Sequence, residues 1–178
     1  MKAITLLLAA VLFLGACTDQ KAMDEKEAQL AELQSRLDSL QLAQASDYGQ
    51  IAPFMTFQKE DAETAMTFYM GLFENSEIVS LQRWGKDAPS KEGTIMHASF
   101  TLDGRLYRCS DSPAIHEWDF TPAVSNYVEC SDDTQLKTLF TALAENGQVL
   151  MPLGNYGFSQ QFGFVQDRFG VSWQLNLP

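Results

Sequence analysis

The sequence is poor in histidine, cysteine and basic side chains. It has two histidines, His97 and His116, three cysteines, and 12 Lys and Arg against 23 Asp and Glu, for a formal net charge of −11. An acidic surface repels the phosphates of nucleic acids, so we expect no nucleic-acid partner. Neither histidine has a partner at metal-ligand spacing, and no Ser or Cys stands in a nucleophile motif beside a histidine. The composition therefore disfavours a histidine-based metal site and a Ser-His or Cys-His catalytic centre.

A long hydrophobic run is also missing. The apolar stretch Ile4–Leu14 is shorter than the roughly 20 residues that a membrane-spanning helix requires. It follows Lys2 and ends at Leu14-Gly15-Ala16-Cys17. A basic start, a short apolar region and small residues at its end predict a cleaved secretory signal over residues 1–16.

The Leu-Gly-Ala-Cys ending resembles the lipobox of bacterial lipoproteins. This resemblance implies that Cys17 becomes the acylated N-terminus of the mature chain, which anchors it to a membrane by diacylglycerol and a fatty acid such as palmitate. The alternative is an ordinary cleaved signal in which Cys17 is incidental. Thr18 follows the cysteine, where an Asp would be the inner-membrane retention signal. The resemblance therefore favours the cell envelope, at the outer membrane on its periplasmic face or surface.

Two cysteines remain if Cys17 is acylated. Cys109 and Cys130 are then the one possible intramolecular pair, and the envelope is oxidising enough for a disulfide. The alternative is two small buried hydrophobic side chains. The sequence leaves both alternatives open.

Residues 17–50 differ in composition from the rest of the chain. Met23, Leu30 and Leu37 are seven residues apart, and Leu33 and Leu40 take interleaved positions. This heptad pattern lies in a segment without Gly or Pro and predicts a helical spacer, which forms either a short coiled coil or a partly helical charged tether.

Residues 51–178 predict an α+β domain. Two helices are expected, over 61–73 and from 132 to about 146, because apolar residues there recur at helical spacing. The carboxylate pairs Glu60-Asp61 and Asp132-Asp133 stand at the helix starts, where capping explains them. The expected strands are 51–57, 77–84, 94–102, 105–110, 123–130, 148–153, 160–166 and 171–177. The order βαβββ thus occurs twice, with Asp103-Gly104 and Phe169-Gly170 at corresponding turns.

Two βαβββ units resemble the vicinal oxygen chelate superfamily, which includes glyoxalase I, extradiol dioxygenases and bleomycin- and fosfomycin-resistance proteins. The local sequence resembles its PhnB-like branch, often labelled demethylubiquinone methyltransferase. The matching segments are Ala62–Ala65, Phe68-Tyr69, Phe73–Ser76, Arg83–Gly85, Phe100–Gly104, Phe120–Ser125 and Asp167–Gln174. The methyltransferase label is unsupported, since no Gly-rich strand-to-helix loop for a nucleoside cofactor is present.

Enzymes of the superfamily hold a divalent metal with one side chain from the first and last strand of each unit. Registration on the Phe-Tyr pair and on the turn glycines places these positions at Phe54, Arg108, Ser125 and Gln174. Phe has no lone pair, Arg is a permanent cation, and Ser and Gln are weak neutral ligands. The resemblance therefore implies neither a metal nor another cofactor in this chain.

The same registration implies a cavity lined by other chemistry. Arg108 is its sharpest feature, because an inward guanidinium can hold a carboxylate, phosphonate or phosphate by two parallel hydrogen bonds. Alternatively, Arg108 pairs with Glu129 or another acid, or reaches solvent. Aromatic residues on the central linker and after Pro152 either rim the opening or pack normally. The cavity candidates are Phe54, Thr56, Trp84, Arg108, Ser125, Tyr127 and Gln174, and the rim candidates are Trp118, Phe120, Tyr156 and Phe158.

Three functions are compatible with these expectations. The leading hypothesis is a non-catalytic module that binds a small molecule, an anionic one if Arg108 points into the cavity, and is anchored to a membrane by lipid. The second is a vicinal oxygen chelate enzyme, lyase- or dioxygenase-like, working without metal or with a shifted site. The third is a structural or assembly lipoprotein. We also expect a homodimer, because dimers are common in the superfamily.

Overall fold

The computed structural model describes residues 22–37 and 51–178. The chain divides into two units, residues 1–50 and 51–178. In the first, residues 22–37 form a helix whose side chains are all exposed. No helix among the described residues is long and apolar enough to cross a membrane. The helical prediction is therefore confirmed over 22–37, whereas Cys17 and the rest of the spacer lie outside the described residues.

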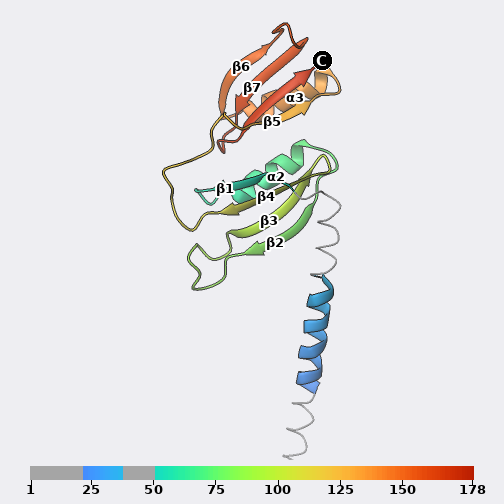
Figure 1. Ribbon diagram of the computed structural model, residues 1–178, viewed down its shortest axis with the longest axis vertical. Helices are drawn as coiled ribbons and strands as arrows, with labels where there is room; N and C mark the ends of the chain where they lie inside the picture. Colours follow the sequence, from blue (N-terminus) through green and yellow to red (C-terminus); the bar gives the residue numbers. More distant parts are fainter. Residues whose placement is uncertain (1–21, 38–50) are drawn as a thin grey trace, which may run out of the picture. The chain divides into compact units, whose positions relative to one another are not determined.

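The second unit contains two successive βαβββ modules, which confirms the predicted α+β fold class. Figure 1 shows that each helix lies along one face of the sheet of its own module. Both sheets are mixed and have matching strand orders, β1-β4-β3-β2 and β5-β8-β7-β6. The first module comprises β1 (Phe54–Phe57), α2 (Ala62–Leu72), β2 (Ile78–Arg83), β3 (Ile95–Leu102) and β4 (Arg105–Asp111). The second comprises β5 (Asn126–Glu129), α3 (Asp133–Ala144), β6 (Gln148–Gly154), β7 (Gln161–Gln166) and β8 (Ser172–Leu177).

Alternation along the strands gives each sheet a helix-covered face and an open face. In β1, Met55 and Phe57 are buried, whereas Phe54 is about half exposed. Successive side chains of a strand point to opposite faces, so Phe54 lies on the face away from α2. Its Cα partner on β4 is Arg108, which lies on the same open face.

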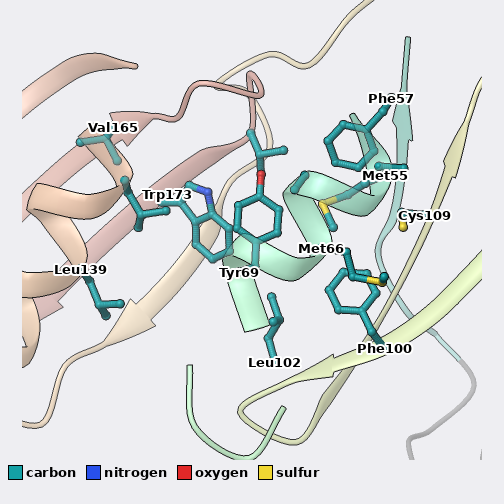
Figure 2. Close-up of a cluster of buried hydrophobic side chains, with 14 of the residues drawn as sticks. Met55, Phe57, Met66, Tyr69, Phe100, Leu102, Cys109, Leu139, Val165 and Trp173 are labelled. Carbon is teal, nitrogen blue, oxygen red and sulfur yellow. The ribbon is translucent and has the colours of Figure 1, made fainter. Parts of the chain in front are cut away.

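The hydrophobic core continues from one module into the other. Tyr69 of α2 is fully buried, and its ring lies 5.1 Å from that of Trp173 on β8. Figure 2 shows these two rings side by side, with Met66 and Phe100 of the first module beyond them. Phe73 at the end of α2 stacks on Trp173 with ring centroids 5.5 Å apart. The buried aromatic side chains therefore join the two halves of the duplication.

The two helix starts are capped differently. Asp132 accepts a hydrogen bond from the Gln135 amide, which confirms its predicted role as the N-cap of α3. The prediction for Asp61 is wrong, because its side chain makes no capping hydrogen bond. Asp111 at the end of β4 accepts from the Ala62 amide instead, at 3.0 Å, and also from the Ile95 amide at 2.8 Å.

Smaller differences concern strand ends and cysteines. Strands β1 and β5 begin three residues later than predicted, at Phe54 and Asn126. Cys109 and Cys130 are both buried free thiols, so the structure selects the hydrophobic alternative over the disulfide. Burial raises the pKa of Cys109 to about 12 and that of Cys130 to about 11, which keeps both thiols protonated and unreactive.

Candidate functional site

The open face of the first sheet carries one cation among hydroxyl groups. Arg108 is half-buried on β4, and Ser99 is its Cα partner on β3. Thr56 and Ser110 are Cα partners of each other and lie one alternation further along the same face. None of the ion pairs among the described residues includes Arg108. Glu129, its predicted partner, instead accepts from Asn176 at 2.6 Å. The predicted alternative of an Arg108–Glu129 pair is therefore absent here.

Two rings lie beside this guanidinium. Phe54 and His97 have ring centroids 5.8 Å apart on the open face. Burial lowers the pKa of His97, and the charge of Arg108 lowers it further. The imidazole is thus held neutral at pH 7, when its ring can either donate or accept a hydrogen bond.

The open face of the second sheet is polar and aromatic. Gln174 of β8 donates to the Ser125 hydroxyl at 2.7 Å, and Tyr127 is the Cα partner of Gln174 on β5. Tyr127 lies 6.5 Å from Phe162, ring centroid to ring centroid. Tyr156 and Phe158 also surround Phe162, at 6.0 and 5.1 Å. These two predicted rim residues therefore belong to an aromatic cluster on the second sheet.

The cavity candidates separate into two groups. Phe54, Thr56 and Arg108 share the first open face, and Ser125, Tyr127 and Gln174 lie at the second. Phe54 and Ser125 line one common hollow of about 300 Å³. Ser125 and Tyr127 line a second hollow of about 480 Å³. Among the described residues, Thr56, Arg108 and Gln174 line neither of these hollows.

The remaining candidates have local partners. Trp84 donates from its indole nitrogen to the Asp111 carbonyl. Trp118 is about half exposed and stacks on His116 with ring centroids 4.3 Å apart. Phe120 packs against the core, with its ring centroid 5.2 Å from that of Phe57. For Phe120, normal packing is therefore the better interpretation, and it also forms one wall of the smaller hollow.

The four positions that correspond to metal ligands do not form a metal site. Phe54 and Arg108 lie on one sheet, and Ser125 and Gln174 lie at the other, so each unit contributes two positions as the superfamily pattern implies. Their donor atoms are unsuited to a divalent cation. Within residues 22–37 and 51–178, no group of three or more His, Cys, Asp or Glu side chains is arranged to hold a metal ion.

Sequence reasoning missed a buried carboxylate that ties the modules together. Asp167 accepts from the Tyr69 hydroxyl at 2.7 Å and the Trp173 indole at 2.9 Å. It also accepts from the amides of Phe169 and Val171, at 2.8 and 3.1 Å. Burial raises the pKa of Asp167, and the four donors oppose that rise. The Tyr69 partner could not be found from spacing, since it lies 98 residues away along the chain.

A cation–π contact strengthens the same junction. The Arg168 guanidinium carbon lies 4.1 Å from the centre of the Phe68 ring and 5.5 Å from that of Phe169. Contacts of this type contribute about 0.5–1 kcal/mol when exposed. The segment 167–174, one of those that resemble the PhnB-like branch, therefore holds α2 against the second module.

Comparisons with known proteins agree with this architecture. A family described as 3-demethylubiquinone-9 3-methyltransferase matches residues 49–176. A putative 3-demethylubiquinone-9 3-methyltransferase, PhnB protein, from Bacillus cereus is 49% identical, with a TM-score of 0.70 over 72% of this chain and 99% of that one. Protein PA1353 from Pseudomonas aeruginosa is 30% identical, with a TM-score of 0.59 over 72% and 96%. No curated protein matched.

The methyltransferase description does not fit the strand-to-helix connections. Residues 58–61 join β1 to α2 and residues 130–132 join β5 to α3, and neither segment contains a glycine. A nucleoside cofactor is usually cradled by a Gly-rich loop at such a position. These two connections therefore do not provide the Gly-rich loop that the methyltransferase description would lead one to expect. By its fold and by the match over residues 49–176, the chain belongs to the PhnB-like family, 3-demethylubiquinone-9 3-methyltransferase.

Proposed function

We propose that this protein is a lipid-anchored envelope protein whose PhnB-like domain binds a small anionic molecule without metal catalysis. The observation that carries the binding proposal is Arg108, a half-buried cation with no carboxylate partner among the described residues. A guanidinium in partial burial attracts an oxyanion more strongly than one in bulk water. On a chain of net charge −11, such a cation is also locally distinctive.

The surroundings of Arg108 suit an oxyanion. Ser99 is buried beside it, and Thr56 and Ser110 lie further along the same face. Hydroxyl groups can donate to ligand oxygens that the guanidinium leaves free. Phe54, about half exposed at the edge of this face, would cover an apolar part of the ligand.

The binding proposal is tested with methylphosphonate as the probe and the His97 ring signal in NMR as the readout. A bound anion offsets the charge of Arg108, so the pKa of His97 should rise on saturation. Arg108→Gln should weaken binding at least tenfold. Arg105→Gln is the matched control, since Arg105 stands on the same strand but on the helix side. Equal weakening by both variants, or no saturable response to small phosphonates, phosphates and carboxylates, contradicts the proposal.

Anchorage is a separate proposal with a separate test. The signal-like residues 1–16 and the lipobox-like Leu14–Cys17 support it. Wild-type protein expressed in a bacterial host should fractionate with membranes and require detergent for release. Cys17→Ala should leave the protein in the soluble envelope fraction, whereas Cys109→Ala should behave as the wild type. A Cys17→Ala protein that stays detergent-extractable contradicts lipidation.

An assembly role through the N-terminal helix has one specific observation in its favour. Met23, Leu30, Leu33 and Leu37 are all more than half exposed on the described helix. Repeats of this kind bury their apolar side chains by association. We propose that this stripe pairs two copies. Sedimentation of the mature chain with and without residues 18–50 tests this: loss of the dimer on deletion supports it, and an unchanged dimer assigns pairing to the globular domain.

A further inference from the structure

We infer that the hollow of about 300 Å³ beside β1 is a second binding site, for a small uncharged molecule with an apolar ring and a hydroxyl or carbonyl group. It is distinct from the open face around Arg108, and only Phe54 is common to both. Its walls come from the start of β1, the linker 119–126 and the beginning of β8. Its volume is at the lower end of the range of small-molecule sites.

The walls are apolar and fixed in place. Phe120 is held from behind by Phe57, with an edge-on ring contact at 5.2 Å. Gly170 lies against the same side chain, since a Cβ at this glycine would be 3.5 Å from Phe120, an ordinary van der Waals distance. Val124 and Val171 complete the apolar lining. A preformed apolar wall favours a flat hydrocarbon group, because little ordering is needed on binding.

The strongest indication of a ligand is an unsatisfied hydroxyl. Ser172 is 98% buried, as its exposed fraction is 2%, and it lines this hollow. Its Oγ has no hydrogen-bond partner among the described residues. A buried hydroxyl without a partner costs about 1–3 kcal/mol, so such groups are uncommon. A ligand oxygen in the hollow would supply the partner once the hydroxyl rotates about χ1 toward it.

Neighbouring polar groups have capacity left for the same ligand. Ser125 accepts from Gln174 and retains its own hydroxyl proton for donation. The Asn126 Oδ1 atom accepts from Tyr107, which leaves the amide NH₂ of Asn126 as a donor. Ser125, Asn126 and Ser172 therefore provide two or three hydrogen bonds on one side of an apolar hollow.

The charges of the side chains that line the hollow indicate which class of ligand it can bind. Among the residues that the structure describes, no Lys, Arg or His lines the hollow, and Asp119 is its one ionisable side chain. An anion would lose its hydration without meeting a cation, so it is disfavoured. An uncharged ring with a hydroxyl group satisfies Ser172 and covers the aromatic walls. The ligand class thus differs from the anion proposed for the Arg108 face.

The test uses two probes that differ in one hydroxyl, benzyl alcohol and toluene, with the intact domain and NMR detection. In the wild type, benzyl alcohol should bind more tightly than toluene and shift the amides of Val124, Ser125 and Val171. Ser172→Ala should weaken benzyl alcohol binding between about twofold and tenfold and leave toluene unchanged. The preference for the hydroxyl should therefore shrink or vanish in this variant, as in a double-mutant cycle.

Ser159→Ala is the matched control, since Ser159 is another buried serine of the second module and does not line the hollow. It should retain the preference for benzyl alcohol. An equal loss in both variants, shifts that map away from residues 119–126 and 171–172, or equal affinity for the two probes in the wild type overturns the inference. Because methylphosphonate tests the Arg108 face separately, failure of either site is distinguishable from failure of the other.

Discussion

At the scale of single residues, buried carboxylates determine more of this domain than exposed ion pairs do. Asp111 satisfies the amides of Ala62 and Ile95 and so joins the start of α2 to β3. Asp111→Ala would leave both donors without a partner, and we expect a loss of about 2–4 kcal/mol in the free energy of unfolding. Asp61→Ala should cost under about 0.5 kcal/mol, because Asp61 makes no cap.

Urea unfolding followed by circular dichroism measures both variants under one condition. A cost for Asp61→Ala equal to that for Asp111→Ala would restore Asp61 as the N-cap and contradict the assignment.

The two helix starts also differ in how far their capping residues can be predicted from the sequence. An Asp stands at the start of both α2 and α3, but α2 is capped by Asp111, which lies 49 residues after Ala62. Capping by a residue distant in sequence leaves no local pattern. Asp132 bonds within its own turn, so its role as N-cap could be predicted from the local sequence.

The open face offers a second residue-scale prediction. Because burial is the larger cause of the lowered pKa of His97 and Arg108 the smaller, Arg108→Gln should raise this pKa partway toward its ordinary value near 6.5. Titration of the imidazole signals by NMR measures the change, and His116→Gln leaves a single histidine for assignment. A pKa of His97 that stays the same or falls further would show that the Arg108 charge does not act on it.

At the scale of elements, the contact between α3 and the second sheet depends on a missing side chain. A Cβ at Gly163 of β7 would lie 2.6 Å from the Phe140 ring and 2.9 Å from Leu153. Gly163→Ala should therefore destabilise the domain by about 1–3 kcal/mol through overpacking. Gly85→Ala is the matched control, because nothing lies within 4 Å of the added carbon there.

Thermal or urea unfolding compares the two glycine variants directly. A Gly163→Ala domain as stable as the Gly85→Ala domain would mean that α3 shifts easily on its sheet. The sequence predicted both elements well, because apolar residues recur every three or four positions in the helix and alternate in the strand. It did not predict their close approach at Gly163, since a glycine within a strand can equally mark a bulge.

At the scale of the whole molecule, the two modules share one core and should unfold together. Tyr69→Phe removes the donor to Asp167, and we expect a loss of about 1 kcal/mol with a single transition preserved. Tryptophan fluorescence reports on Trp84 of the first module, Trp118 of the linker and Trp173 of the second module, and circular dichroism reports on the backbone. Two separated transitions in the variant would show that this hydrogen bond, rather than the aromatic contacts, couples the modules.

The candidate site could be predicted only in part from the sequence. Registration on the superfamily's ligand positions placed Phe54 with Arg108 and Ser125 with Gln174. Strand alternation added Thr56 and Tyr127, because the period of two fixes which side chains share a face. It could not say whether the two faces meet, because that depends on how the modules pack. Ser172 could have been predicted as a cavity residue, since it stands two residues before Gln174 and therefore on the same face of β8.

The segment Asp167–Trp173 has a consequence for how such proteins are classified. Its carboxylate, its indole and the cation of Arg168 all engage residues of the protein itself, at the junction between the halves. This segment, which resembles the PhnB-like branch, thus holds the two halves of the domain together. Two proteins can share this segment in full while their exposed surfaces bind unrelated molecules. Membership of the family therefore does not determine the activity.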